Sequence, residues 1–513
     1  MYKDVRPFTT YSLLLTEDCN LACTYCYEIN TTGHKKSKMD YKIADQVLKF
    51  TFEEAMKEPN PKERMVSYSF FGGEPTLNMK IIDYLCENGK LLSKKHGIRF
   101  DVSIITNATN MNRTTYEIFK KHRDIFNNVQ LSIDGHKDVQ DTNRRTKSGH
   151  GSFDMIEKNI PYWKSLFGDC LHIHGVLSKA SMSELFNSFI YFREKWNIPR
   201  IWFLPAKDKN YTEEDLQIYK NELNKIYEYI MCDVRKNNRV DEIQNYAPLD
   251  RSLRCDKSGK PCGAGDTYCT ITSKGDIYPC HHLYYVDSDE TQRETKLGDI
   301  WNGVDLSKKY MWYAYDNNDM IGCEECDHDH CYRCIAENYE EFKTPFIQIK
   351  GNHCKLMKID QYFQNKIKKE ITEMGLLNKT NGNGGGSCKC NARENDSCLC
   401  NVDTTKGTHR DCVGKIGQCD LVVSVDDCIF DRSNTPSLKD VPDFDDIKNE
   451  EINDDNCRGD DNCCGNDNYC GDDNCCGNCG DKEESNDNVP KQEINNMLNE
   501  LIDVLASYQK KWF

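Results

Sequence analysis

The sequence predicts an α/β fold: a partial (β/α)6 barrel on six parallel strands, then a small cysteine-rich domain, then a largely disordered tail rich in Cys, Asp and Asn. Three observations carry this prediction. Apolar β-rich runs alternate with helical segments in the first half, cysteines cluster where the alternation stops, and the tail lacks apolar periodicity until residue 490. The predicted strands are Tyr11–Leu15, Val66–Phe71, Phe100–Ile105, Val129–Ile133, Leu171–Leu177 and Ile201–Leu204.

Segments with helical periodicity separate these strands and would supply the crossovers that parallel strands require. They are Tyr41–Met56, Met79–Lys94, Phe153–Leu166 and Glu213–Met231. A further helix is expected at Lys358–Met374, before a glycine-rich linker. We therefore expect a barrel over residues 1–236, a cysteine-rich domain over 237–375, a linker and tail over 376–489, and an amphipathic helix over 490–513.

The formal net charge is -16, and nearly all of it lies in the tail. From Glu373 onward the chain has 29 of its 83 acidic residues but only 14 of its 67 basic ones, so the body is close to neutral. Nucleic acids and anionic membranes both attract basic surfaces, so neither is expected as a partner. The sequence shows no membrane-spanning apolar run and no secretory signal, so a cytoplasmic protein is expected.

The 29 cysteines favour metal ligation over a disulfide framework, because such frameworks are typical of small secreted chains. Fifteen cysteines precede Glu373 and fourteen follow it, with different spacings. Cys19, Cys23 and Cys26 share one loop directly after the first predicted strand. Three thiolates can hold three corners of a cubane iron–sulfur cluster and leave one iron open, whereas a structural zinc site has four ligands.

Motifs at the ends of the next three predicted strands resemble those of the radical S-adenosylmethionine (radical SAM) superfamily. They are Gly72-Gly73-Glu74-Pro75, Thr106-Asn107 and Ser132-Ile133-Asp134-Gly135. The aromatic position before the third cysteine is Tyr25, and Arg144 resembles the family's carboxylate-binding arginine. The resemblance implies a [4Fe–4S] cluster on the first three cysteines, whose open iron binds S-adenosylmethionine (SAM). Its cofactor contacts would be Tyr25, Gly72, Gly73, Glu74, Asn107, Ser132 and Arg144.

The second cysteine group includes a predicted hairpin. Tyr268–Thr272 and Ile277–Pro279 flank Gly275, where a positive φ would return the chain so that Cys280 approaches Cys262. The spacing of this group resembles the SPASM domain, which carries auxiliary clusters in peptide-modifying radical SAM enzymes.

The SPASM resemblance implies two auxiliary [4Fe–4S] clusters, which makes three clusters in all. Ligands of the first would be Cys262, Cys280 and Cys334, and those of the second Cys323, Cys326, Cys331 and Cys354. Cys255 is the preferred fourth ligand of the first cluster and Cys269 the alternative; if neither binds, that iron is open to a substrate thiolate. The chain has spacings of four and two residues where the family usually has five and three, which leaves the pairing of Cys331 and Cys334 open.

Two pairs of histidines have open interpretations. His172 and His174 share one face of the fifth predicted strand, where they line a substrate channel or belong to the core. His281 and His282 follow Cys280, where sulfatase-activating relatives have an aspartate that acts as a base, and this difference weakens a formylglycine-forming role.

The tail cysteines allow a metal-binding, a regulatory or a substrate interpretation. Their second block resembles Cys-rich precursor peptides, which would make the chain a fusion of enzyme and substrate. Some maturases join a cysteine sulfur to an acidic residue four positions later. Three pairs have this spacing: Cys457 with Asp461, Cys463 with Asp467, and Cys479 with Glu483. In such an acidic segment, pairs of this kind also arise by chance.

The preferred function is a radical SAM peptide maturase that oxidatively modifies a Cys-rich ribosomal peptide and forms thioether crosslinks. The alternatives are side-chain oxidation like that of anaerobic sulfatase maturases, carbon–carbon crosslinking, and a non-enzymatic iron–sulfur or metal-binding scaffold. Expected partners are a Cys-rich precursor peptide, with the chain's own tail as a candidate in cis, and an electron donor such as flavodoxin or ferredoxin. No leader-binding domain is expected ahead of the barrel.

Overall fold

The computed structural model describes residues 5–30, 36–206, 211–238, 240, 243, 245–250, 262–286, 294–314, 321–323, 326, 334–348 and 351–376. Cys255, Cys331, the linker, the tail and the predicted C-terminal helix lie outside the described residues. The predictions that concern them stay predictions.

One ten-stranded sheet runs through the described part of the chain, in the order β10-β9-β8-β7-β1-β2-β3-β4-β5-β6. The six predicted strands are parallel, which confirms the α/β prediction. Only β4 starts more than one residue from its predicted position. The strands are β1 (Thr10–Thr16), β2 (Met65–Gly72), β3 (Arg99–Thr106), β4 (Phe126–Ser132), β5 (Leu171–Leu177) and β6 (Arg200–Pro205).

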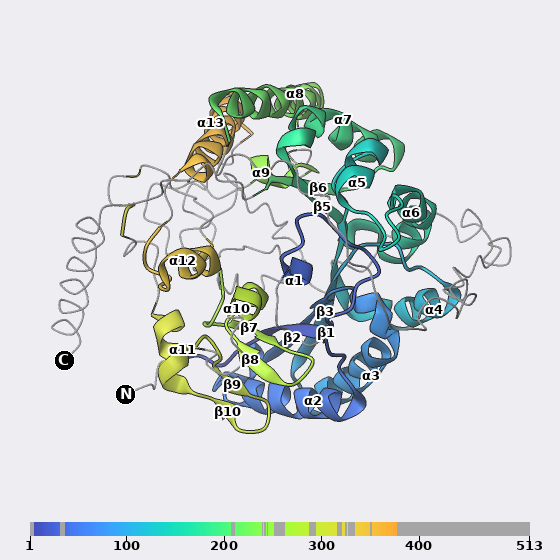
Figure 1. Cartoon of the computed structure of the whole chain (residues 1–513), viewed down its shortest axis with the longest axis vertical. Coiled ribbons are helices and arrows are strands. Elements are labelled where there is room, and N and C mark those ends of the chain that lie inside the picture. The colour runs from blue at the N-terminus through green and yellow to red at the C-terminus, as the bar shows by residue number, and fades with distance from the viewer. Residues whose placement is uncertain are drawn as a thin grey trace, which may run out of the picture. The chain divides into compact units, whose positions relative to one another are not determined.

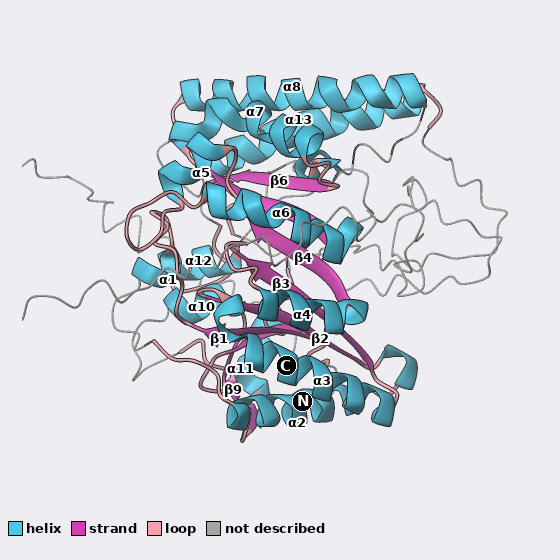
Figure 2. Cartoon of the chain, turned by 90° about the vertical axis from the view of Figure 1, so that its right-hand side faces the viewer, coloured by secondary structure: helices cyan, strands magenta, loops and turns pink. Residues whose placement is uncertain are grey.

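Helices surround this curved sheet on its outer side (Figure 1). Figure 2 shows α3, α4 and α6 in front of the strands, where they cover the outer face. Local caps fix several helix ends: the Asp40 side chain accepts from the Ile43 N–H (2.8 Å), and Gly97 ends α3 in the left-handed region. The helices of this half are α1 (Tyr27–Asn30), α2 (Tyr41–Met56), α3 (Met79–His96), α4 (Arg113–His122), α5 (Lys137–Asn143), α6 (Phe153–Phe167), α7 (Leu185–Ile190), α8 (Glu213–Asn237) and α9 (Ala247–Asp250).

The cysteine-rich part continues the same sheet across the boundary predicted at residue 236. β7 (Tyr268–Ile271) pairs in parallel with β1 and antiparallel with β8 (Asp276–Tyr278), and Gly275 between them has φ +87°. The remaining elements are β9 (Gly298–Asp299), β10 (Gly303–Val304), α10 (His281–Val286), α11 (Leu306–Tyr313), α12 (Ile335–Phe342) and α13 (Asn352–Glu373). The sheet therefore brings both groups of cysteines into one body.

Several side-chain contacts join α13 to α8, among them two that involve tyrosines of α8. The Tyr219 hydroxyl donates to the Asp360 carboxylate (2.6 Å), and the Tyr227 hydroxyl donates to Glu370 (2.5 Å). α13 begins six residues before its predicted start, so its first turn carries Cys354. None of the helices within the described ranges has both the length and the apolar character that a membrane span needs.

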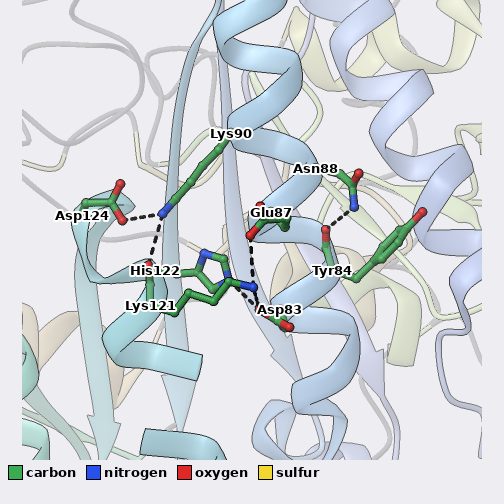
Figure 3. A network of polar contacts seen from close by, with 8 residues as sticks. All are labelled: Asp83, Tyr84, Glu87, Asn88, Lys90, Lys121, His122 and Asp124. Carbon is green, nitrogen blue, oxygen red and sulfur yellow. Dashed lines mark hydrogen bonds and ion pairs between the residues drawn. The ribbon is translucent and has the colours of Figure 1, made fainter. Parts of the chain in front are cut away.

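A polar network ties α3 to α4 on the outside of the barrel (Figure 3). The Asp83 carboxylate lies 2.7 Å from His122 Nε2 and 2.9 Å from Lys121 Nζ. Burial lowers the pKa of His122, whose side chain is only 1% exposed. Lys90 and Asp124 add an exposed ion pair at 2.5 Å. The network is remote from the strand ends that carry the predicted site, and we assign it a structural role.

Candidate functional site

The first three cysteines lie on the loop that leaves β1 at its carboxyl end. Cys19, Cys23 and Cys26 are partly buried, and the Cys26 N–H donates to the Cys23 carbonyl (3.2 Å). Burial raises the pKa of the Cys19 thiol to about 12, and it also raises that of Cys23. Thiols in such surroundings become thiolates only when a metal centre binds them.

The glycine motif after β2 holds one edge of this loop. The Gly73 N–H donates to the Thr16 carbonyl (2.8 Å), and the Glu74 N–H donates to the Asp18 carbonyl (2.8 Å). A Cβ atom at Gly73 would lie 2.3 Å from the Asp18 oxygen, and one at Gly72 would lie 2.2 Å from that of Thr16. The glycines are therefore needed for the close approach of the cysteine loop. The carbonyl oxygens of the motif are the backbone groups that could accept from a ligand's amino group.

The Glu74 carboxylate connects this motif to the end of β3. It is buried and accepts hydrogen bonds from the Thr106 hydroxyl (2.7 Å) and the Asn107 N–H (2.7 Å), besides two from Thr76. Burial raises the pKa of Glu74, and these donors oppose the shift. Glu74 thereby positions Asn107; its own contact with a cofactor stays a prediction.

Asn107 in turn contacts the cysteine loop. Its side-chain amide donates to Asn20 (2.8 Å) and lies 3.7 Å from the Cys19 sulfur. The Leu21 N–H also donates to that sulfur (3.4 Å). N–H donors directed at cysteine sulfur are a usual feature of iron–sulfur sites, where they tune the cluster.

The segment after α5 holds the other edge of the loop. The Ala22 N–H donates to the Arg145 carbonyl (2.7 Å), and the Thr24 N–H donates to the Asn143 carbonyl (3.0 Å). Arg144 lies between these two contacts, and its guanidinium is 5.4 Å from the centre of the Tyr25 ring. Tyr25 and Arg144, both predicted to contact the cofactor, therefore lie together.

A residue without a predicted role of its own, Asp134, organises this side. Its carboxylate is 1% exposed and accepts from the Tyr25 hydroxyl (2.6 Å), from Arg144 Nε (2.9 Å) and from the Val176 N–H (2.9 Å). Burial alone would lower the pKa of Arg144, but Asp134 and Tyr25 raise it above its ordinary value. The signal in the sequence was an acidic residue before glycine at the end of a buried strand. Ser132 is half-buried on β4, and its predicted cofactor contact stays a prediction.

Three cysteines of the second group lie near one another. Burial raises the pKa of the Cys280 thiol, and the nearby thiols of Cys334 and Cys262 raise it further. The Cys334 sulfur is 4.0 Å from Nδ1 of His282. Among the ligands predicted for the second auxiliary cluster, the Cys326 N–H donates to the Cys323 carbonyl (3.0 Å), which places both in one turn.

Cys269 points away from these thiols. Side chains alternate along a strand, and the neighbouring Tyr268 hydroxyl contacts Nδ1 of His281 (3.1 Å), beside Cys280. Cys269 is completely buried on the opposite face of β7, where Lys309 and Glu54 are its charged neighbours. This placement disfavours Cys269 as the fourth ligand of the first auxiliary cluster, and the ligand role of Cys255, outside the described residues, stays a prediction.

Across the described ranges, no three His, Cys, Asp or Glu side chains converge as ligands of one metal ion would. Cysteines around a cubane bind different iron atoms, so they need not converge on one point. Three thiols on one loop, with N–H donors at a sulfur, therefore fit a cluster better than a zinc ion.

Tyrosines of α10 link the cysteine loop to the second group. The Tyr284 hydroxyl donates to Glu17 (2.7 Å) and that of Tyr285 donates to Glu28 (3.2 Å). Burial raises the pKa of Glu28 to about 7. The Tyr27 ring, next to Cys26, lies 5.1 Å from the ring of His282. Local sequence patterns gave no sign of these contacts, because their partners lie far apart along the chain.

Comparison with known proteins gives two matching families. The radical SAM superfamily matches residues 13–188, and the SPASM iron-sulfur cluster-binding domain matches residues 262–334. A cysteine-type anaerobic sulfatase-maturating enzyme of Clostridium perfringens is 25% identical over 331 residues, which cover 62% of this chain and 83% of that enzyme. An uncharacterized protein of Methanocaldococcus jannaschii is 30% identical over 285 residues, covering 53% of this chain and 84% of that protein.

The fold is shared with a solved structure, native anSMEcpe with bound AdoMet and Kp18Cys peptide. Its sequence identity is 20% and its TM-score 0.55, with 72% of this chain and 100% of that chain covered.

Gly73→Ala should cost the protein its first cluster, because the new Cβ atom meets the Asp18 carbonyl. Iron and acid-labile sulfide analysis of the reconstituted protein should show about four iron atoms per chain fewer than in the wild type. Gly149→Ala is the control: nothing lies within 4 Å of the added atom, although Gly149, unlike Gly73, has a positive φ (+85°). Full iron content in Gly73→Ala would contradict the account of the loop.

Asp134→Asn should destabilise the fold, because it leaves the buried Arg144 guanidinium without a carboxylate. The expected loss is about 3 kcal/mol of unfolding free energy, typical of a broken buried pair. Urea unfolding followed by circular dichroism measures it, with the exposed Asp138→Asn as the control. Equal unfolding midpoints for the two variants would show that Asp134 does not support the site.

Proposed function

Because the chain belongs to the radical SAM superfamily and carries a SPASM iron-sulfur domain, we propose that it is a peptide maturase that forms thioether crosslinks in a Cys-rich ribosomal peptide. The observation that carries this proposal is the closeness of the two cysteine groups. Tyr27 follows Cys26 of the first group, and His282 lies beside Cys334 of the second group. The rings of Tyr27 and His282 are in contact, with centres 5.1 Å apart.

Cys19, Cys23 and Cys26 would hold the first cluster, and SAM would bind its open iron. The carbonyl oxygens of the glycine motif are suited to the amino group of SAM, and Arg144 is suited to its carboxylate. Asp134 and Tyr25 keep the guanidinium in one orientation, so its charge is placed before the ligand arrives.

When bound, the first cluster and SAM would supply a 5′-deoxyadenosyl radical that takes a hydrogen atom from a peptide carbon, and the auxiliary clusters would supply an acceptor for the second electron. The peptide thus loses a hydrogen atom from carbon and a proton from sulfur as the carbon–sulfur bond forms. An electron donor such as flavodoxin or ferredoxin would deliver the electron that cleaves SAM. The protein's own task is to place the peptide and exclude water.

Similarity to a peptide-bound structure supports a peptide substrate. The solved structure reported above contains AdoMet and the Kp18Cys peptide, and it shares the fold of this chain. The chain's own tail, with fourteen cysteines and many acidic residues, is the candidate substrate in cis.

Side-chain oxidation is the second candidate, favoured by the similarity to a cysteine-type sulfatase-maturating enzyme. Histidine at position 281, where sulfatase-activating relatives have an aspartate base, disfavours it. The two reactions differ in their products, because conversion of cysteine to an aldehyde removes sulfur, whereas a thioether retains it.

The full-length protein should lose two hydrogen atoms per thioether during anaerobic turnover with SAM and dithionite. Intact-mass analysis after thiol alkylation measures this loss, and fragmentation should place it between tail cysteines and acidic residues. A Cys23→Ala variant treated in parallel should keep its mass. An unchanged wild-type mass with every tail thiol alkylated would contradict thioether formation in cis, and loss of sulfur would favour side-chain oxidation.

A further inference from the structure

The inner face of β4, β5 and β6, which faces away from the helices, carries two rows of partly exposed side chains, most of them polar. On β5, Leu171, Ile173 and Leu177 are buried, whereas His172 and His174 between them are partly exposed. Side chains that alternate in this way point to opposite faces of the sheet. The buried set faces the outer helices, so the two histidines face inward.

The register places these histidines beside matching residues of the neighbouring strands. His172 pairs with Gln130 on β4 and with Arg200 on β6, and His174 pairs with Trp202. Each of these residues is partly exposed. We call this set the β4–β6 wall: Gln130, His172, His174, Arg200 and Trp202.

Contacts within the β4–β6 wall hold its imidazoles in place. Nε2 of His172 lies 3.3 Å from the Gln130 side-chain oxygen, so the neutral ring donates to it. The rings of His174 and Trp202 meet edge-to-face, with centres 5.4 Å apart.

The β4–β6 wall carries a positive charge on Arg200. Burial, together with the nearby His174 and Arg200, lowers the pKa of His172 to about 3, so this imidazole is neutral at ordinary pH. Arg200 therefore supplies the permanent positive charge of this patch, and the imidazoles beside it supply polar N–H groups. A carboxylate placed beside Arg200 could accept charge-assisted hydrogen bonds from its guanidinium, which has five N–H donors.

The β4–β6 wall adjoins the predicted cofactor site. The His174 carbonyl accepts from the Ile133 N–H (3.1 Å), and Ile133 directly precedes Asp134. The Val176 N–H, two residues beyond His174, donates to the Asp134 carboxylate. A strand advances about 3.3 Å per residue. The distance from the β4–β6 wall to the predicted cofactor site is therefore about the length of one or two residues of an extended peptide.

We propose that the β4–β6 wall is a substrate subsite that binds a side-chain carboxylate of the peptide, close to the carbon that is modified. This inference rests on the proposed peptide maturase function. The charge of the candidate substrate fits it: residues 457–483 of this chain contain seven Asp or Glu residues and only two Lys or Arg residues. Arg200 and the histidines offer the N–H donors that a carboxylate prefers, and Trp202 flanks them with an apolar surface.

Peptide binding to the reconstituted full-length protein, with SAM and without reductant, tests the subsite. The probes are a fluorescent synthetic peptide of residues 457–483 and a matched peptide in which the seven acidic residues are Asn or Gln. By anisotropy, the wild type should bind the acidic peptide about tenfold more tightly, the usual scale for a charge-assisted hydrogen bond. Arg200→Gln should bind both peptides alike. His174→Gln should reduce the preference in the same way, and it carries the test if Arg200→Gln does not fold.

Lys94→Gln is the control, because it removes an exposed charge of α3 outside the sheet and should keep the full preference. Equal affinity of the wild type and Arg200→Gln for the neutral peptide shows that the variant is folded. If both wall variants still prefer the acidic peptide as strongly as the wild type does, the subsite is overturned and the peptide function is not. The same holds if the wild type binds both peptides equally. A wild type that binds neither peptide overturns the peptide function as well.

Discussion

The backbone hydrogen bonds that hold the cysteine loop on both edges are the constraint on which the rest of the site depends. One edge pairs with the glycine motif after β2, and the other with the segment around Arg144. Parallel strands make this possible, because their carboxyl ends meet at one edge of the sheet. Residues far apart in the sequence thus fix the positions of three thiols before a cluster binds.

Buried charges make this arrangement specific. Glu74 and Asp134 are almost fully buried carboxylates, and such groups are costly unless hydrogen bonds satisfy them. Glu74 is satisfied only when the end of β3 is in place, and Asp134 only when Arg144 and Tyr25 are. A misplaced loop would leave a charge unpaired, so the same contacts that position the cofactor residues also exclude other loop conformations.

Local patterns in the sequence predicted the strands and helices α2, α3 and α6 closely, whereas α8 ends six residues after its predicted end and α13 begins six residues before its predicted start. α2 has its predicted bounds, because an Asp40 cap precedes an amphipathic segment, and Gly275 has the positive φ expected of its turn. The motif residues around the cysteine loop were also predicted to act together, and the structure places Tyr25 and Arg144 side by side. Strand periodicity alone separates Cys269 from its neighbour Tyr268, because successive residues of β7 point to opposite faces.

Contacts between distant side chains could not be predicted. The role of Asp134 depends on donors from three separate segments, and the Glu17–Tyr284 contact joins the two cysteine-rich regions. The periodicity of the local sequence does not indicate such pairs. The continuation of the sheet from β1 to β7 was missed for the same reason, because strand pairing across more than two hundred residues leaves no local signal.

Reductive cleavage of SAM tests the central claim most directly. The reconstituted protein, given SAM and dithionite under anaerobic conditions, should form 5′-deoxyadenosine and methionine in equal amounts. A variant with Cys19, Cys23 and Cys26 all replaced by alanine should form neither, while keeping the iron bound by the second cysteine group. A wild type that forms no 5′-deoxyadenosine, or a triple variant that forms as much as the wild type, would contradict the assignment of the cysteine loop.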